Sequence, residues 1–165
     1  RRVDAERQIR AFARRQACQV SIFRAPGIYA EDRLPLSRLQ SGTPAILAEE
    51  DAYSNHVHAL DLARLTALGL FRARNCRVYH ACDGEHHKMG DYFDQVADAA
   101  ALVRPIRISR LQAQKTLSPT LLSFMNESRR LSNLRLMAEL RYRLRYPSLE
   151  SCLLSFREKL IDKSG

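Results

Sequence analysis

The segment 80–88, which reads HACDGEHHK, concentrates side chains that can bind a metal or transfer a proton. Its possible ligands are Cys82, Asp83, Glu85, His86 and His87. The Cys-x-x-x-His spacing lacks a second Cys or His pair at a known zinc spacing, so a polar loop between a strand and a helix is the favoured interpretation. His56 and His58 share one face of a predicted strand and could also bind a metal, but we assign no metal site to either segment.

Nucleophilic catalysis has no recognisable motif in this chain. There is no Gly-x-Ser-x-Gly elbow, and no cysteine stands beside an identifiable histidine partner. The four cysteines are far apart and lie in apolar segments: Cys18, Cys76, Cys82 and Cys152. This pattern predicts buried, reduced thiols rather than a disulfide framework, and therefore a cytoplasmic protein.

Residues 23–35, FRAPGIYAEDRLP, lie at the end of a short apolar strand and indicate a ligand-binding loop. Tyr29 and Arg33 are candidate substrate contacts, because a planar guanidinium can bind a phosphate or carboxylate with two hydrogen bonds. A solvated Arg33 is the alternative. Pro26-Gly27 is equally compatible with a simple turn after the strand.

The elements that would position these residues alternate between helix and strand. Helices are predicted over 2–17, from an Asp61 cap to about residue 73, over 91–102, after Ser118-Pro119, over 134–141 and from Leu149 onward. Strands are predicted over 18–24, 45–48, 53–59, 77–82 and 106–109, with a helical turn at 36–40. This order predicts an α/β fold with mostly parallel strands.

Composition places the chain among ordinary globular proteins, since 45% of its 165 residues are hydrophobic and 27% are charged. We therefore treat residues 1–165 as a single region. No apolar run approaches the length of a membrane span. The net charge of +9 would permit nucleic-acid binding, but the arginines are scattered and do not alternate with aromatics, so a solvated basic surface is preferred.

Four stretches, taken in order, carry a family resemblance. FRAPGIYAEDRLP is similar to the Arg-x-x-x-x-Tyr-Gly segment after the sixth strand of extended short-chain dehydrogenases/reductases, the NAD-dependent epimerase/dehydratase group. NHVHALDLARLTALGL resembles that family's His-Val-x-Asp-(Leu/Val)-Ala helix start, and RVYHACDG its Tyr-Asn strand end and Asp-Gly turn. RRLSNLRLMAELRYRLRYP resembles its closing segment. The resemblance covers nearly the whole chain and implies the C-terminal half of a Rossmann-like doubly wound fold plus a small helical substrate-binding part.

The resemblance also implies roles for individual residues. Ala25, Pro26, Gly27 and Ile28 would border the nicotinamide of NAD or NADP. Tyr29, Arg33, Asn55 and His56 would line the pocket of a nucleotide-sugar substrate. The Leu149–Leu160 stripe is predicted to be core, with a homodimer contact as the alternative.

Two family features have no match in residues 1–165. The glycines are isolated, so no Gly-x-x-Gly-x-x-Gly phosphate turn is present, and an N-terminal Rossmann half is expected to supply it. The family's catalytic Tyr and Lys are expected upstream, with Arg2 where the Lys would stand. Arg cannot be deprotonated, so it is a poor substitute, and Ala30 and Ala59-Leu60 also depart from the pattern.

We therefore expect a portion of a hydride-transferring epimerase, dehydratase or reductase that is inactive by itself. A non-catalytic binding module for a protein or nucleic-acid partner, based on the arginine-rich helix 2–15, is the alternative.

Overall fold

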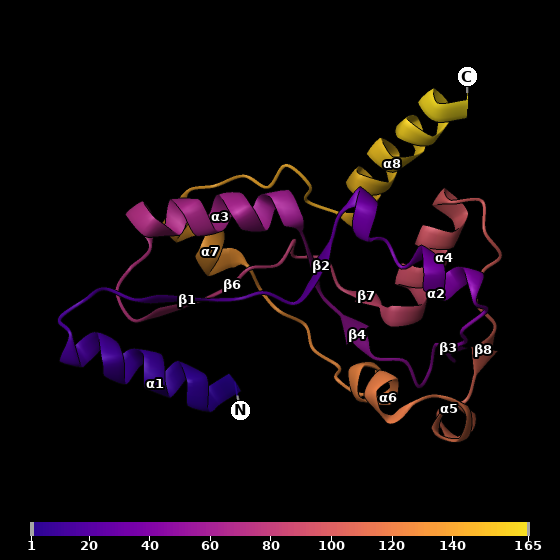
Figure 1. The fold of residues 1–165 in the computed structure, drawn as a ribbon, viewed down its shortest axis with the longest axis horizontal. Coiled ribbons are helices and arrows are strands. Elements are labelled where there is room, and N and C mark those ends of the chain that lie inside the picture. The colour runs from indigo at the N-terminus through magenta and orange to yellow at the C-terminus, as the bar shows by residue number, and fades with distance from the viewer. Residues whose placement is uncertain (1, 165) are drawn as a thin grey trace.

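Helices and short strands alternate along the chain, as the sequence predicts (Figure 1). The computed structural model describes residues 2–164, and the side chains of Arg2, Phe124 and 160–164 fall outside that description. The strands are β1 Ser21–Arg24, β2 Gly27–Tyr29, β3 Ala45–Ile46, β4 Tyr53–Ser54, β5 His56–His58, β6 Arg77–His80, β7 His87–Lys88 and β8 Arg107–Ile108. The helices are α1 Arg2–Arg15, the 3-10 turn η1 Glu31–Arg33, α2 Leu36–Gln40, α3 Ala59–Arg72, α4 Met89–Ala99, α5 Arg110–Thr116, α6 Pro119–Met125, α7 Leu134–Leu140 and α8 Leu149–Ser164.

The strands pair two by two. β1 pairs with β6, β2 with β5 and β3 with β8, all parallel, and β4 pairs with β7 antiparallel. The prediction of mostly parallel strands is confirmed. Within residues 2–164, β1 pairs with β6 alone, so the other edge of β1 keeps its backbone groups free for a further strand.

One face of the β1–β6 pair is covered by α3 and α7. Leu65 of α3 and Leu136 and Leu140 of α7 are fully buried against Tyr79 and Ala81. Gly69 lets α3 approach closely, because a Cβ there would lie 2.6 Å from the Phe23 ring. α7 is also fixed to β6 by Glu139. Its carboxylate pairs with Arg77 at 2.6 Å and accepts a hydrogen bond from the Tyr79 hydroxyl at 2.8 Å.

Asp61 is not the helix cap that the sequence predicts. α3 begins two residues earlier, at Ala59, and His58 caps it by accepting a hydrogen bond from Leu60 N at 3.2 Å. Asp61 is fully buried and instead accepts hydrogen bonds from the Tyr142 hydroxyl and from Arg145 N and Tyr146 N, at 2.7 to 2.9 Å. A buried carboxylate needs such partners, so Asp61 organises the segment between α7 and α8.

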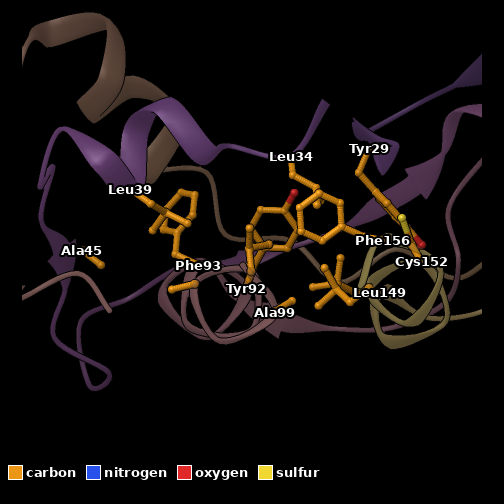
Figure 2. Close-up of a cluster of buried hydrophobic side chains, with 13 residues drawn as sticks. Tyr29, Leu34, Leu39, Ala45, Tyr92, Phe93, Ala99, Leu149, Cys152 and Phe156 are labelled. Atoms are coloured by element: carbon orange, nitrogen blue, oxygen red, sulfur yellow. The ribbon is translucent and has the colours of Figure 1, made fainter. Parts of the chain in front are cut away.

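The largest core lies between α4 and α8 (Figure 2). Tyr92, Phe93 and Val96 of α4 belong to the same cluster as the stripe of α8, whose described members Leu149, Cys152, Leu153 and Phe156 are all buried. The prediction that this stripe is core is confirmed for these four residues. The Leu160 side chain lies outside the described residues.

A smaller core joins β3 to α5 and α6 through Ile46, Ala113 and Met125. Ser118 caps α6 as predicted, because its hydroxyl accepts a hydrogen bond from Leu121 N at 3.4 Å and Pro119 occupies the first turn. α5 was not predicted. It begins with a capping box, in which the Ser109 and Gln112 side chains bond each other's backbone N–H.

α1 forms over the predicted residues but leaves its apolar stripe exposed. Ala13 is its only buried side chain among those described, whereas Ile9 and Phe12 are 44% and 55% exposed. Figure 1 shows α1 below β1 and α3 above it. A bidentate pair between Glu6 and Arg24 fixes α1 to the end of β1, with N–O distances of 2.7 and 2.9 Å.

None of the helices in residues 2–164 combines the length and apolar character needed to cross a bilayer.

Candidate functional site

The candidate cofactor residues lie where β1 ends. After Arg24 the chain turns and pairs alongside β5, with Gly27 opposite His56 and Tyr29 opposite His58. Part of the expected loop is therefore a strand, β2, which the sequence does not reveal because its three residues are too few to show alternation. Ala25, Gly27 and Ile28 are exposed and Pro26 is half-buried, so this segment has an open outer surface.

Packing within the chain explains why position 27 is a glycine. A Cβ at this position would lie 2.6 Å from Cδ2 of His56, which is closer than real Cβ atoms approach. Glycine is therefore required for the β2–β5 pairing over the His56 ring. This requirement holds whether or not a nicotinamide borders the segment, so the proximity of Gly27 to a cofactor stays a prediction.

His56 lies buried beneath β2. Its ring stacks on Tyr92 with centroids 4.2 Å apart, and its Nε2 is 3.0 Å from the Ser54 hydroxyl oxygen. Burial, with a contribution from nearby His87, lowers the pKa of His56 to about 4. The imidazole is thus neutral at physiological pH and suited to hydrogen bonding rather than to binding an anion by charge.

The other predicted substrate residues differ in exposure and in their partners within the chain. Tyr29 is 1% exposed and its hydroxyl donates to the Ser148 carbonyl at 3.2 Å, so a substrate contact would require β2 to move. Burial raises the pKa of Tyr29 well above its usual value, which keeps the phenol protonated. Arg33 is exposed on η1. Asn55 bonds the Arg129 carbonyl at 2.6 Å and Leu131 N at 2.8 Å, which places it in the scaffold.

A polar cluster follows β6, at the same carboxyl ends of the strands. Asp83 N donates to the His56 carbonyl at 2.9 Å, and the Asp83 carboxylate accepts from Glu85 N at 3.1 Å. Glu85 in turn lies 2.8 Å from His87 Nε2 and accepts from Leu149 N at 3.1 Å. These bonds tie the end of β6 to β7 and to the first turn of α8.

Asp83 is the side chain in this cluster with the most unusual proton affinity. Only 8% of it is exposed, and burial raises its pKa to about 7, with the nearby Glu85 charge acting in the same direction. A carboxyl with this pKa can hold or release a proton near neutral pH. The sequence marks Asp83 as a possible ligand and as part of an Asp-Gly turn, but its burial depends on contacts with distant segments and is not visible there.

The site residues do not assemble a metal centre. Over the described part of the chain, no three His, Cys, Asp or Glu side chains come close enough together to hold a metal ion. Segment 80–88 is a polar loop that includes the short strand β7, in agreement with the favoured interpretation.

The sequence matches no family model and no curated protein. Solved structures do match. A protein of unknown function from Silicibacter pomeroyi has a TM-score of 0.84 and 28% identity over 96% of this chain and 54% of its own. A nucleoside-diphosphate-sugar epimerase from Pseudomonas aeruginosa has a TM-score of 0.74 and 18% identity over 97% of this chain and 53% of its own.

A third match is UDP-glucose 4-epimerase from Thermotoga maritima, solved with UDP-glucose, with a TM-score of 0.71 and 15% identity over 99% of this chain and 52% of its own. This chain has the fold of the C-terminal half of NAD-dependent epimerase/dehydratase structures. It spans about half the length of each of these proteins. The α/β fold class, with the Rossmann-like half and helical part predicted from the sequence, is confirmed.

Proposed function

We propose that this chain supplies the substrate side of an NAD(P)-dependent nucleotide-sugar epimerase, dehydratase or reductase. In this proposal, residues 1–165 complete their function by packing against a glycine-rich Rossmann half. The observation that carries it is the combination of a free edge on β1 with an exposed apolar stripe on α1. An unpaired strand edge and an exposed helix stripe are both surfaces that a further αβ unit would cover.

The free edge of β1 lies on the side away from β6, and α7 occupies the β6 side. Arg135 of α7 bonds the Val78 carbonyl of β6 at 3.2 Å, and Glu139 pairs with Arg77. A parallel strand added to β1 would therefore extend the sheet without disturbing α7. Because the added strand would run parallel to β1, its carboxyl end would lie beside segment 25–28. Ligands of open α/β sheets bind at this end of the strands.

Individual residues then have definite roles. Ala25, Pro26 and Gly27 would present backbone, and Ile28 its exposed side chain, toward the nicotinamide. Arg33, exposed on η1, is available for a phosphate of the nucleotide sugar. Asn55 and His56 hold this surface from behind through their bonds to the 129–131 segment and to Ser54.

The residues present fit the ring side of a dinucleotide site but not its phosphate side. The open backbone of 25–28 can border a ring, but the described residues hold no glycine-rich turn at the start of a helix. Other proteins with this fold were solved with NAD or NADPH. When bound, such a cofactor supplies the hydride acceptor or donor, while this chain would orient the sugar and shield it from water.

Two titrations test the proposal. With NADPH alone, the chain should show no saturable change in cofactor fluorescence at micromolar concentrations, because the phosphate cradle lies in the partner half. With millimolar UDP-glucose, amide NMR shifts should change in segments 25–33, 54–56 and 83–87. Micromolar NADPH binding, or shifts confined to other segments, would contradict the proposal.

A binding module is the second candidate, and the exposure of Arg7, Arg14 and Arg15 on α1 favours it. Salt-dependent retention on heparin should then be lost in an Arg7→Gln/Arg14→Gln variant. Matched neutralisation of Arg141 and Arg143, which are exposed elsewhere, should leave retention unchanged. Retention that falls equally in both variants would indicate a diffuse basic surface and no dedicated site.

A further inference from the structure

Two cysteine side chains share one cleft at the amino ends of β1 and β6. The cleft has a volume of about 370 Å³ and is lined by Ala13, Arg14, Ala17, Cys18, Gln19, Asn75 and Cys76. Both Cys18 and Cys76 are exposed free thiols. The sequence-based prediction that all four cysteines are buried is wrong for these two, because each follows the end of a helix in a turn that leads to a strand.

Direct hydrogen bonds hold the two walls of the cleft together. Cys76 N donates to the Val20 carbonyl at 2.6 Å, and Val20 N donates to the Asn75 side-chain oxygen at 3.0 Å. The parallel register of β1 and β6 begins at the next pair, Ser21 and Arg77. Cys18 lies two residues before Val20, whose carbonyl accepts the Cys76 N–H, so both cysteines flank the same junction between the two walls.

The backbone on both walls turns sharply beside the thiols. Ala17 and Cys76 have φ values of 49° and 57°, the left-handed region that non-glycine residues rarely adopt. The ladder between β1 and β6 begins at Ser21 and Arg77, so movement of the turn at Ala17 leaves it intact, whereas movement at Cys76 would break the bond to the Val20 carbonyl. The turn at Ala17 is therefore where the backbone would move to bring the two thiols of this cleft to disulfide geometry.

The other two thiols have a different environment. Cys82 and Cys152 are fully buried, and burial raises their pKa values to about 11 and about 12. Because the thiolate is the reactive form, these two should be inert. Arg14, by contrast, places a cation at the cleft, where it attracts reagents that carry carboxylates.

We propose that Cys18 and Cys76 form a reversible dithiol–disulfide pair that reacts with low-molecular-weight disulfides such as oxidised glutathione. One thiol loses its proton and attacks a sulfur of the reagent, which forms a mixed disulfide and releases one glutathione thiolate. The second thiol loses its proton and attacks the protein-bound sulfur, which closes the Cys18–Cys76 bond and releases the second glutathione. Two protein thiols are oxidised and one reagent disulfide is reduced to two thiols, so electrons and protons balance.

The closed bond would fix the carboxyl end of α1 to the start of β6. At present the described contacts of α1 are few, with Ala13 buried and Glu6 paired to Arg24. The cleft lies at the amino ends of the strands, whereas the candidate site lies at their carboxyl ends. The inference is therefore independent of the proposed function, and either can fail alone.

Oxidation of the whole chain followed by mass spectrometry tests the pair. After treatment with oxidised glutathione, the intact mass should fall by two hydrogens, and peptide mapping should find Cys18 joined to Cys76. Dithiothreitol should restore the original mass. Hydrogen exchange in the last turn of α1 should slow about tenfold in the oxidised chain, because opening that turn then requires more of the structure to open.

Single variants distinguish the two steps. Cys18→Ser and Cys76→Ser should each stop at one retained glutathione, and the double variant should gain none, since Cys82 and Cys152 are buried. A wild-type product that keeps glutathione on both cysteines, or forms only intermolecular dimers, would overturn the proposal. So would unchanged hydrogen exchange in α1 after the bond has formed.

Discussion

At the scale of single residues, Asp83 determines a pH dependence that its sequence position does not reveal. Its native pKa of about 7 lies above the ordinary value of 3.8. At pH values between 3.8 and about 7, the native state therefore keeps a proton that the unfolded state has lost. The free energy of unfolding falls as the pH rises through this range. The total loss from this group is up to about 4 kcal/mol.

The Asp83→Asn variant should remove this contribution, because an amide does not titrate. Urea unfolding of both proteins from about pH 5 to about pH 8 should give a wild-type-minus-variant difference that declines with pH and levels off above the native pKa. Asp32→Asn, at an exposed position of η1, is the matched control and should give a flat difference. A flat difference for Asp83→Asn as well would show that the carboxyl is ionised throughout.

Asp61 leads to a second prediction at this scale. The loss in the free energy of unfolding should increase with the number of its hydrogen bonds that a substitution removes. Asp61→Ala leaves the Tyr142 hydroxyl and two backbone N–H groups without an acceptor, and should lower the free energy of unfolding by roughly 3 kcal/mol or more. Tyr142→Phe removes one of the three bonds and should cost about 1 kcal/mol. Equal losses in chemical denaturation would mean that the carboxylate does not act through all three bonds.

At the scale of elements, α1 and α8 both carry an apolar stripe, but the stripe of α1 is exposed and that of α8 is buried. Ile9 and Phe12 of α1 are exposed, whereas Leu149 of α8 is 1% exposed. Ile9→Ala and Phe12→Ala should change the free energy of unfolding by less than about 0.5 kcal/mol, since both side chains lie at the surface. Leu149→Ala should cost roughly 3 kcal/mol, through lost burial and the cavity it leaves.

Urea denaturation of the three variants measures this contrast directly. A loss of more than about 1 kcal/mol for Phe12→Ala would mean that the α1 stripe is already covered in the chain by itself. That result would remove the main support for a second half packed on α1. Unchanged stability in all three variants would instead question the α4–α8 core.

At the scale of the whole molecule, the sequence predicted most elements because their periodicity and caps are local. Ser118-Pro119 began α6 and the Leu149 stripe was core, as expected. β2 and β7 were missed because each is only two or three residues long and forms by pairing with a distant strand. Asp61 was assigned to the wrong role for a related reason, since its partners Tyr142, Arg145 and Tyr146 come from the far end of the chain.

The candidate site was predictable to a smaller extent. The end of β1 could be located from a strand followed by Pro26-Gly27, and the ligand-facing role of 25–28 stays a prediction. Burial could not be read from residue types: Tyr29 and Asn55 are buried and bond other segments of the chain, and their contact with a substrate stays a prediction. The proton affinity of Asp83 and the shared cleft of Cys18 and Cys76 likewise depend on which segments meet in space.

The arrangement of cores predicts where the molecule is most stable. The α4–α8 core buries thirteen residues, whereas α1 buries Ala13 and β1 has an unpaired edge. Amide hydrogen exchange should therefore be slowest in α4 and the first turns of α8, and fastest in α1, because exchange follows the free energy of local opening. β1 should be intermediate, protected on the β6 side alone.

This order should change when the open face is covered. If a Rossmann half packs on α1 and β1, as we propose, a chain joined to that half should slow exchange in α1 and β1 by at least about tenfold, while α4 changes little. Exchange measured by mass spectrometry on the chain alone and on the joined protein gives both values. Slow exchange in α1 of the chain alone, equal to that in α4, would mean that residues 2–15 already have a partner surface and need no further half.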